Sequence, residues 1–78
     1  MKELIKEFNK FCRERRMPIL IDDDYNENDM YKILYFIRGF DETKLNEIIF
    51  TKILPTLKPK NNLQKIYYVM LQEVSSPQ

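Results

Sequence analysis

Few side chains in this sequence are suited to chemistry. Its 78 residues include no histidine, one cysteine (Cys12) and one glycine (Gly39). Catalytic triads and most zinc sites require histidine or several cysteines, and phosphate-binding loops require several glycines. Cys12 falls in an apolar helical pattern, where a cysteine acts as a small hydrophobic residue and its thiolate is disfavoured. We therefore expect no enzyme activity, no cofactor and no metal site.

An acidic stretch at residues 22–29 has part of the spacing of a calcium-binding loop. Oxygen-bearing side chains occupy the first, third, fifth and seventh positions of an EF-hand-like loop, namely Asp22, Asp24, Asn26 and Asn28. The sixth position of such a loop requires glycine and is Glu27, and the twelfth requires a bidentate glutamate and is Ile33. The stretch is better interpreted as a solvated acidic cap for the next helix, with a secondary electrostatic contact to a partner as the alternative.

Charge is balanced overall but segregated along the chain. Thirteen Lys and Arg face twelve Asp and Glu, with a net +3 over residues 1–17, −5 over 18–29 and +2 over 55–78. Near neutrality argues against the strong uniform field that drives non-specific nucleic-acid binding. Two basic groups would nevertheless form a phosphate-contacting patch if the fold brought them together. They are Arg13, Arg15 and Arg16 in one group and Lys58, Lys60 and Lys65 in the other.

Residues 39–41, Gly-Phe-Asp, resemble the turn of a DNA-binding helix-turn-helix. Two features oppose that interpretation. Tyr35 stands four residues before the glycine, where a small residue usually lets the two helices approach. The second helix would open with Asp41 and Glu42, whose charge repels phosphates.

Apolar residues recur at helical spacing in four stretches that are separated by Pro, Asn and Asp. They predict helices over residues 2–16, 25–38, 42–54 and 62–74. In the last helix the expected buried stripe is Leu63, Ile66, Tyr67, Met70, Leu71 and Val74. The predicted fold class is therefore all-α, a compact four-helix bundle-like single domain over residues 1–74 with a polar tail at 75–78.

The starts of these helices carry recognisable caps. The second helix has two candidate starts, either Asp24 with Glu27 as a capping box or Asn28 as the N-cap. Asp41 is the expected cap of the third helix, and one of the two asparagines at 61–62 starts the fourth.

The ends of the helices are marked by proline and glycine. Pro18 closes the first helix, and the apolar connector at residues 19–21 is expected to plug the bundle. Gly39 is expected to end the second helix in the left-handed conformation, with Phe40 making the hydrophobic contact of a Schellman stop. Pro55 should end the third helix.

The sequence also predicts a cytoplasmic protein without a membrane anchor. A single cysteine cannot form an intramolecular disulfide, and the opening MKELIKEFNKF carries charges where a secretory signal needs an uninterrupted apolar stretch. The longest apolar runs are far shorter than the roughly 20 residues that span a bilayer.

The second predicted helix has more apolar surface than one small core needs. Its inner stripe is already complete with Met30, Ile33, Leu34 and Ile37. Tyr31, Tyr35 and Arg38 form a second stripe at i, i+4 and i+7, with Phe36 beyond it. We expect Tyr31, Tyr35 and Tyr68 to stay partly exposed. The alternative is that this helix is central and that these side chains belong to the core.

These patterns favour a small non-enzymatic helical module for protein–protein interaction or regulation. Its partner would be another protein or a second copy of the chain, bound through an aromatic face because tyrosine and arginine are enriched at interface hot spots. The expected partner-binding residues are Tyr31, Tyr35, Arg38 and Tyr68. The alternative is a nucleic-acid-associated factor, of the phage or mobile-element regulator type, that uses the two basic groups.

Overall fold

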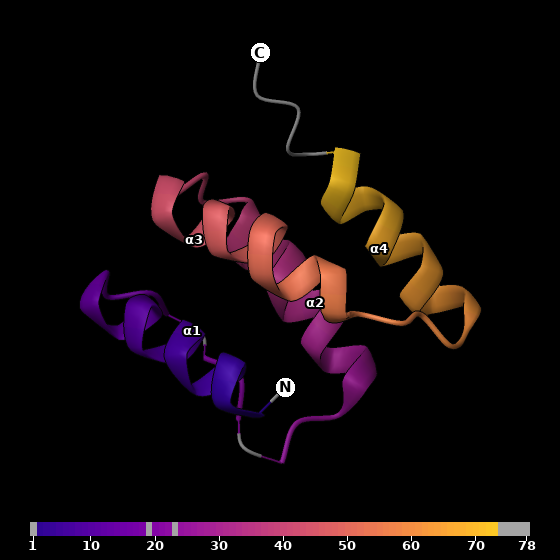
Figure 1. Ribbon diagram of the computed structural model, residues 1–78, viewed down its shortest axis with the longest axis horizontal. Coiled ribbons are helices and arrows are strands. Elements are labelled where there is room, and N and C mark those ends of the chain that lie inside the picture. Colours follow the sequence, from indigo (N-terminus) through magenta and orange to yellow (C-terminus); the bar gives the residue numbers. More distant parts are fainter. Residues whose placement is uncertain (1, 19, 23, 74–78) are drawn as a thin grey trace.

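A computed structural model describes residues 2–18, 20–22 and 24–73 as an all-α domain without strands (Figure 1). Its helices are α1 (Lys2–Glu14), α2 (Glu27–Arg38), α3 (Thr43–Ile48) and α4 (Asn62–Glu73). The predicted fold class is confirmed. Ile19, Asp23, Val74 and the tail expected at 75–78 lie outside the described residues. Within the described part, each helix is too short or too polar to cross a membrane.

Helix α2 is the element shared by both sides of the fold. Helix α3 packs on one side of it with α1 beyond, and α4 lies along the other side (Figure 1). The first turns of α2 and α4 are hydrogen-bonded to each other, so the two helices run in the same direction. The chain between them returns through α3.

The core is built mainly by α1, α2 and the region of α3. Helix α1 contributes Ile5, Phe8 and Cys12 at i, i+3 and i+7, as its amphipathic pattern predicts. Among the described residues of α4, Leu71 is the only apolar side chain that is fully buried. The stripe expected for α4 is wrong at Ile66, which is 57% exposed, because α4 packs mainly against α2 and covers it with a narrow face.

The connector between α1 and α2 is held by a buried asparagine. The Asn9 side chain donates from Nδ2 to the Ile21 carbonyl at 2.6 Å and accepts at Oδ1 from the Ile21 N–H at 3.0 Å. Both backbone groups of Ile21 are thereby satisfied while its side chain enters the core, as buried peptide groups require. The expected plugging of the core is confirmed at Ile21.

The helix caps differ from those predicted. Asn26 is the N-cap of α2, where its Oδ1 accepts from the Asn28 N–H at 2.8 Å, so neither Asp24 nor Asn28 serves. Asn28 is occupied elsewhere, because its side-chain oxygen accepts hydrogen bonds from the start of α4. Glu42 caps α3 in place of Asp41, accepting from two backbone N–H groups of the first turn.

The Schellman stop predicted at Gly39 is found instead at the end of α1. Arg16 is left-handed (φ 53°), its N–H donates to the Arg13 carbonyl, and the Met17 N–H donates to the Cys12 carbonyl. Gly39 has an ordinary right-handed φ of −64°.

The end of α2 turns two residues beyond Gly39. Phe40 and Asp41 continue the turn through hydrogen bonds to the last carbonyls of α2, and the left-handed residue is Asp41 (φ 54°). The left-handed conformation therefore occurs two residues after Gly39 and not at Gly39 itself.

Pro55 does not end the third helix. The chain continues from α3 through a π-helical turn (Ile49–Ile53) and a 3₁₀ turn (Leu54–Thr56). Proline has no N–H to donate, and its ring clashes with the carbonyl four residues earlier in a regular helix. At the end of the π-helical turn the Leu54 N–H donates to the Ile49 carbonyl, five residues earlier and not four. The carbonyls before Pro55 are therefore not positioned as in a regular α-helix, where the proline ring would clash.

Candidate protein-binding groove on helix α2

Two of the four expected partner-binding residues lie in the core. Tyr31 is 1% exposed and Arg38 is 3% exposed, so the expectation that Tyr31 stays partly exposed is wrong. Tyr35, one turn after Tyr31, is 36% exposed, and Tyr68 is half-buried. The buried arc of α2 is wide because α3 and α4 both pack against it, and Tyr31 falls inside that arc.

The two buried polar side chains of α2, Arg38 and Tyr31, have few polar contacts. The Arg38 guanidinium lies 4.9 Å from the centre of the Phe50 ring, and its Nη1 is 3.9 Å from the exposed Asp41 carboxylate. Among the described residues, none forms a hydrogen bond with its Nε. Burial, followed by the charge of Glu27, raises the pKa of the Tyr31 hydroxyl. Neither residue is available to an incoming protein.

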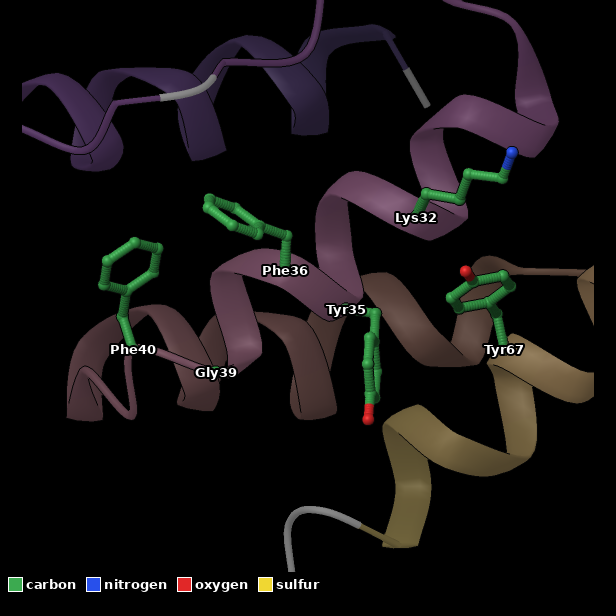
Figure 2. A pocket seen from close by; sticks show the side chains of 6 residues that line it. All are labelled: Lys32, Tyr35, Phe36, Gly39, Phe40 and Tyr67. Carbon is green, nitrogen blue, oxygen red and sulfur yellow. The ribbon is translucent and has the colours of Figure 1, made fainter.

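An aromatic groove lies on the opposite, outer face of α2 (Figure 2). It has a volume of about 510 Å³. It is lined by Lys32, Tyr35, Phe36, Gly39 and Phe40 of α2 and the segment after it, and by Tyr67 of α4. The first five recur at i, i+3, i+4, i+7 and i+8, which places them on one side of the helix. We call this surface the aromatic groove.

Edge-on ring contacts order the floor of the aromatic groove. The Phe36 and Phe40 ring centroids are 5.2 Å apart with an interplanar angle of 80°. Tyr35 and Tyr67 pair across the two helices at 5.7 Å and 69° (Figure 2). These arrangements match the preferred geometry of aromatic pairs. Phe36 and Phe40 are nonetheless 46% and 48% exposed, so each ring presents about half of its surface to solvent.

A polar cluster fixes α4 so that Tyr67 lies beside Tyr35. The Asn28 side-chain oxygen accepts from Asn61 Nδ2 at 3.1 Å and from the buried Gln64 Nε2 at 2.8 Å. The Gln64 N–H in turn donates to Asn61 Oδ1, which caps α4. These bonds join the first turns of α2 and α4 and thereby hold the two helices side by side.

Lys32 gives one end of the aromatic groove a positive charge. It is the only charged residue among those that line the groove. Its ammonium group lies at the opposite end of the groove from Phe40 (Figure 2). Within the described residues Lys32 has no ion pair. The groove therefore combines an apolar floor with one uncompensated cation.

The two basic groups are not brought together. Arg15 pairs with Glu42 at 2.7 Å, beyond the end of α2, whereas Lys60 pairs with Glu27 at 3.3 Å, at its first residue. The 12 residues of α2 separate these pairs by about 18 Å. The end of α1 and the loop before α4 lie at opposite sides of the molecule (Figure 1). Arg13, Arg16, Lys58 and Lys65 are exposed around these two separate positions.

Cys12 is buried in the core, and the acidic loop supplies the N-cap of α2 through Asn26. Burial raises the pKa of the Cys12 thiol to about 11, even though Arg15 and Arg13 oppose the shift. The thiol is therefore neutral at physiological pH, and its nucleophilicity is suppressed. Within the described residues, no three Cys, Asp or Glu side chains gather in a way that could hold a metal ion.

Sequence reasoning missed Phe40 and Tyr67 as members of the aromatic groove. The signal for the α2 side was present, because residues 32, 35, 36, 39 and 40 form a stripe at helical spacing. The stripe through Tyr31 and Arg38 has the same periodicity. Periodicity alone therefore does not tell which of the two stripes is buried by neighbouring helices. No sequence signal places Tyr67 opposite Tyr35.

Comparison with known proteins finds no matching family model, no similar curated protein and no similar solved structure.

Proposed function

We propose that this chain is a non-enzymatic helical interaction module that binds another protein in the aromatic groove. The observation that supports this most is the exposure of Phe36 and Phe40 side by side on a folded domain. Three aromatic side chains of roughly 150–250 Å² each, exposed to the extent of Tyr35, Phe36 and Phe40, leave on the order of 200–300 Å² of exposed aromatic surface. The largest apolar patch on a typical monomer measures about 300–600 Å² and is often functional, and this surface approaches the lower end of that range.

The ordered rings also favour binding. Aromatic side chains supply large contact areas with few rotatable bonds, and these four are already held in edge-on pairs. A partner would therefore lose little free energy to ordering the groove. The separated basic groups offer no comparable continuous surface to nucleic acid.

The test uses a double variant, Phe36→Ser with Phe40→Ser, and a matched control, Ile66→Ser with Val69→Ser. The control residues are exposed apolar side chains of α4 that do not line the groove. Immobilised wild-type protein and both variants are exposed to lysate of the native host, and captured proteins are identified by mass spectrometry. Any protein recovered is then produced alone and titrated against each variant by calorimetry.

We expect the recovered protein to bind wild type and the control variant with similar affinity. Binding to the groove variant should be lost, while its circular dichroism stays helical. Equal binding to both double variants, or loss with the control alone, would refute the proposal.

A further inference from the structure

We infer that the partner segment in the aromatic groove is an amphipathic helix with an acidic residue near one end, which pairs with Lys32. This inference rests on the proposed function and adds the chemistry of the partner. Helix-in-groove recognition uses apolar anchors at i, i+3 or i+4 and i+7 of the bound segment. The length, lining and charge of the groove each favour such a segment.

The length of the groove matches a short helix. Its lining on α2 runs from Lys32 to Phe40, eight residues or about 12 Å along the helix axis. Anchors at i and i+7 of a bound helix are separated by about 10 Å. Five of the six residues that line the groove lie on α2 or directly after it, so a bound helix would pack mainly along α2, with Tyr67 of α4 at its side.

The charge of the groove gives the bound helix a direction. Lys32 stands at one end without an ion pair in the described structure, Phe36 lies in the middle and Phe40 lies at the other end. A carboxylate near Lys32 would compensate the cation, and apolar anchors would cover the rings. A helix bound in reverse would place an apolar residue beside the ammonium group and its carboxylate over the phenylalanine rings.

The exposed area argues against a second copy of this chain as the occupant. The exposed aromatic area of the groove is on the order of 200–300 Å². A standard protein–protein interface buries roughly 800 Å² per subunit, which is much more. Two copies meeting at this face would have to bury several hundred Å² per subunit beyond the aromatic rings. A single helix covers the groove without burying that additional surface.

The test is a selection from displayed random peptides of about 16 residues, long enough for roughly four helical turns. The library is selected in parallel on wild type, on Lys32→Glu and on the Phe36→Ser, Phe40→Ser double variant. On wild type we expect apolar residues at helical spacing with Asp or Glu at one fixed end. On Lys32→Glu that position should change to Lys or Arg, because an exposed substitution reverses the charge without altering the groove floor.

A synthetic peptide of the selected sequence then gives the magnitude. Replacing its acidic residue by Gln or Asn should weaken binding to wild type about fivefold, the upper range for an exposed ion pair. The same replacement should not weaken binding to Lys32→Glu. This cycle isolates the pair from any general effect of the variant.

The outcomes separate the two proposals. If wild type selects nothing that the groove double variant does not, the proposed function fails. Selected peptides that are proline-rich, lack helical spacing or show no acidic preference would preserve the groove as a binding site and overturn this inference. A concentration-dependent dimer in sedimentation that Phe36→Ser abolishes would identify a second copy as the occupant and overturn it as well.

Discussion

The two faces of helix α2 carry similar residues and have opposite environments. Tyr31 and Tyr35 are one turn apart, yet the first is 1% exposed and the second 36% exposed. Arg38 is buried against Phe50, while Lys32 stands free in solvent at the end of the groove. The difference lies in what packs on each face and not in the residues themselves. The sequence of a helix therefore shows how much apolar surface it has. Which part of that surface is buried depends on the helices that pack against it.

This contrast predicts that the inner face determines stability. Tyr31→Ala should lower the free energy of unfolding by about 3–5 kcal/mol, as truncation of a buried aromatic residue does. A domain of this size typically has about 3–5 kcal/mol in total, so much of the variant should be unfolded at 25 °C. Phe36→Ala, on the outer face, should lower the unfolding free energy by only about 1 kcal/mol, because its ring is half exposed and contributes mainly the edge-on pair with Phe40. Urea titration followed by circular dichroism measures both.

The comparison fails if the two substitutions have equal effects. A stable Tyr31→Ala variant would mean that the packing around α2 is loose enough to refill the space. A strongly destabilised Phe36→Ala variant would mean that the edge-on pair with Phe40 contributes strongly to the fold, and the aromatic groove would lose its separate role.

The buried side can also be tested by pH. The Cys12 pKa rises from an ordinary 9.0 to about 11, and burial likewise raises that of Tyr31 above 10.0. Between pH 9 and about 11 the unfolded thiol loses its proton before the native thiol does, so the native state holds more protons and stability falls as pH rises. We expect a loss of about 1.4 kcal/mol per pH unit from Cys12. Urea unfolding at a series of alkaline pH values measures the slope.

Cys12→Ala is the matched control for the alkaline slope. In this variant the loss should begin only above pH 10, where Tyr31 becomes the remaining buried acid. An identical slope between pH 9 and 10 in both proteins would show that the Cys12 thiol does not titrate as its burial implies.

The sequence predicts the elements of this fold better than their boundaries. Ile5, Phe8 and Cys12 are buried because α1 has a single apolar side and only that side can face the core. Leu4 and Phe11 at the edges of this side are partly buried. The caps depend on tertiary contacts. Asn28 would cap α2 by its type and position, but its oxygen is used by α4 from more than thirty residues away.

Other boundaries were unpredictable because the chain uses less common backbone conformations. Arg16 takes the left-handed position that glycine would normally fill, and a π-helical turn followed by a 3₁₀ turn continues the chain from the third helix past Pro55. The groove was predictable only in part. A surplus of apolar surface on the second helix could be inferred, but the choice between Tyr31 and Phe40 as exposed residues depends on where α3 and α4 pack.

The smallest effect concerns the two cations of α2. Arg38 is buried with an unpartnered Nε and a carboxylate at 3.9 Å, so it retains little compensation for the lost hydration of its charge. Methionine matches much of its length without the charge. Arg38→Met should therefore leave the unfolding free energy unchanged or raise it by about 1 kcal/mol, because well-packed apolar replacements of buried ion pairs are often neutral or stabilising. Thermal and urea unfolding measure the change.

Lys32→Met provides the comparison on the outer face, where the side chain is exposed and the unfolding free energy should stay within about 0.5 kcal/mol of wild type. A loss of more than about 1 kcal/mol in Arg38→Met alone would show that the contact of the guanidinium with the Phe50 ring outweighs the cost of burying the charge. In that case Arg38 would be a stabilising part of the inner face. The two faces of α2 would then differ in how they hold a cation as well as in how much they bury.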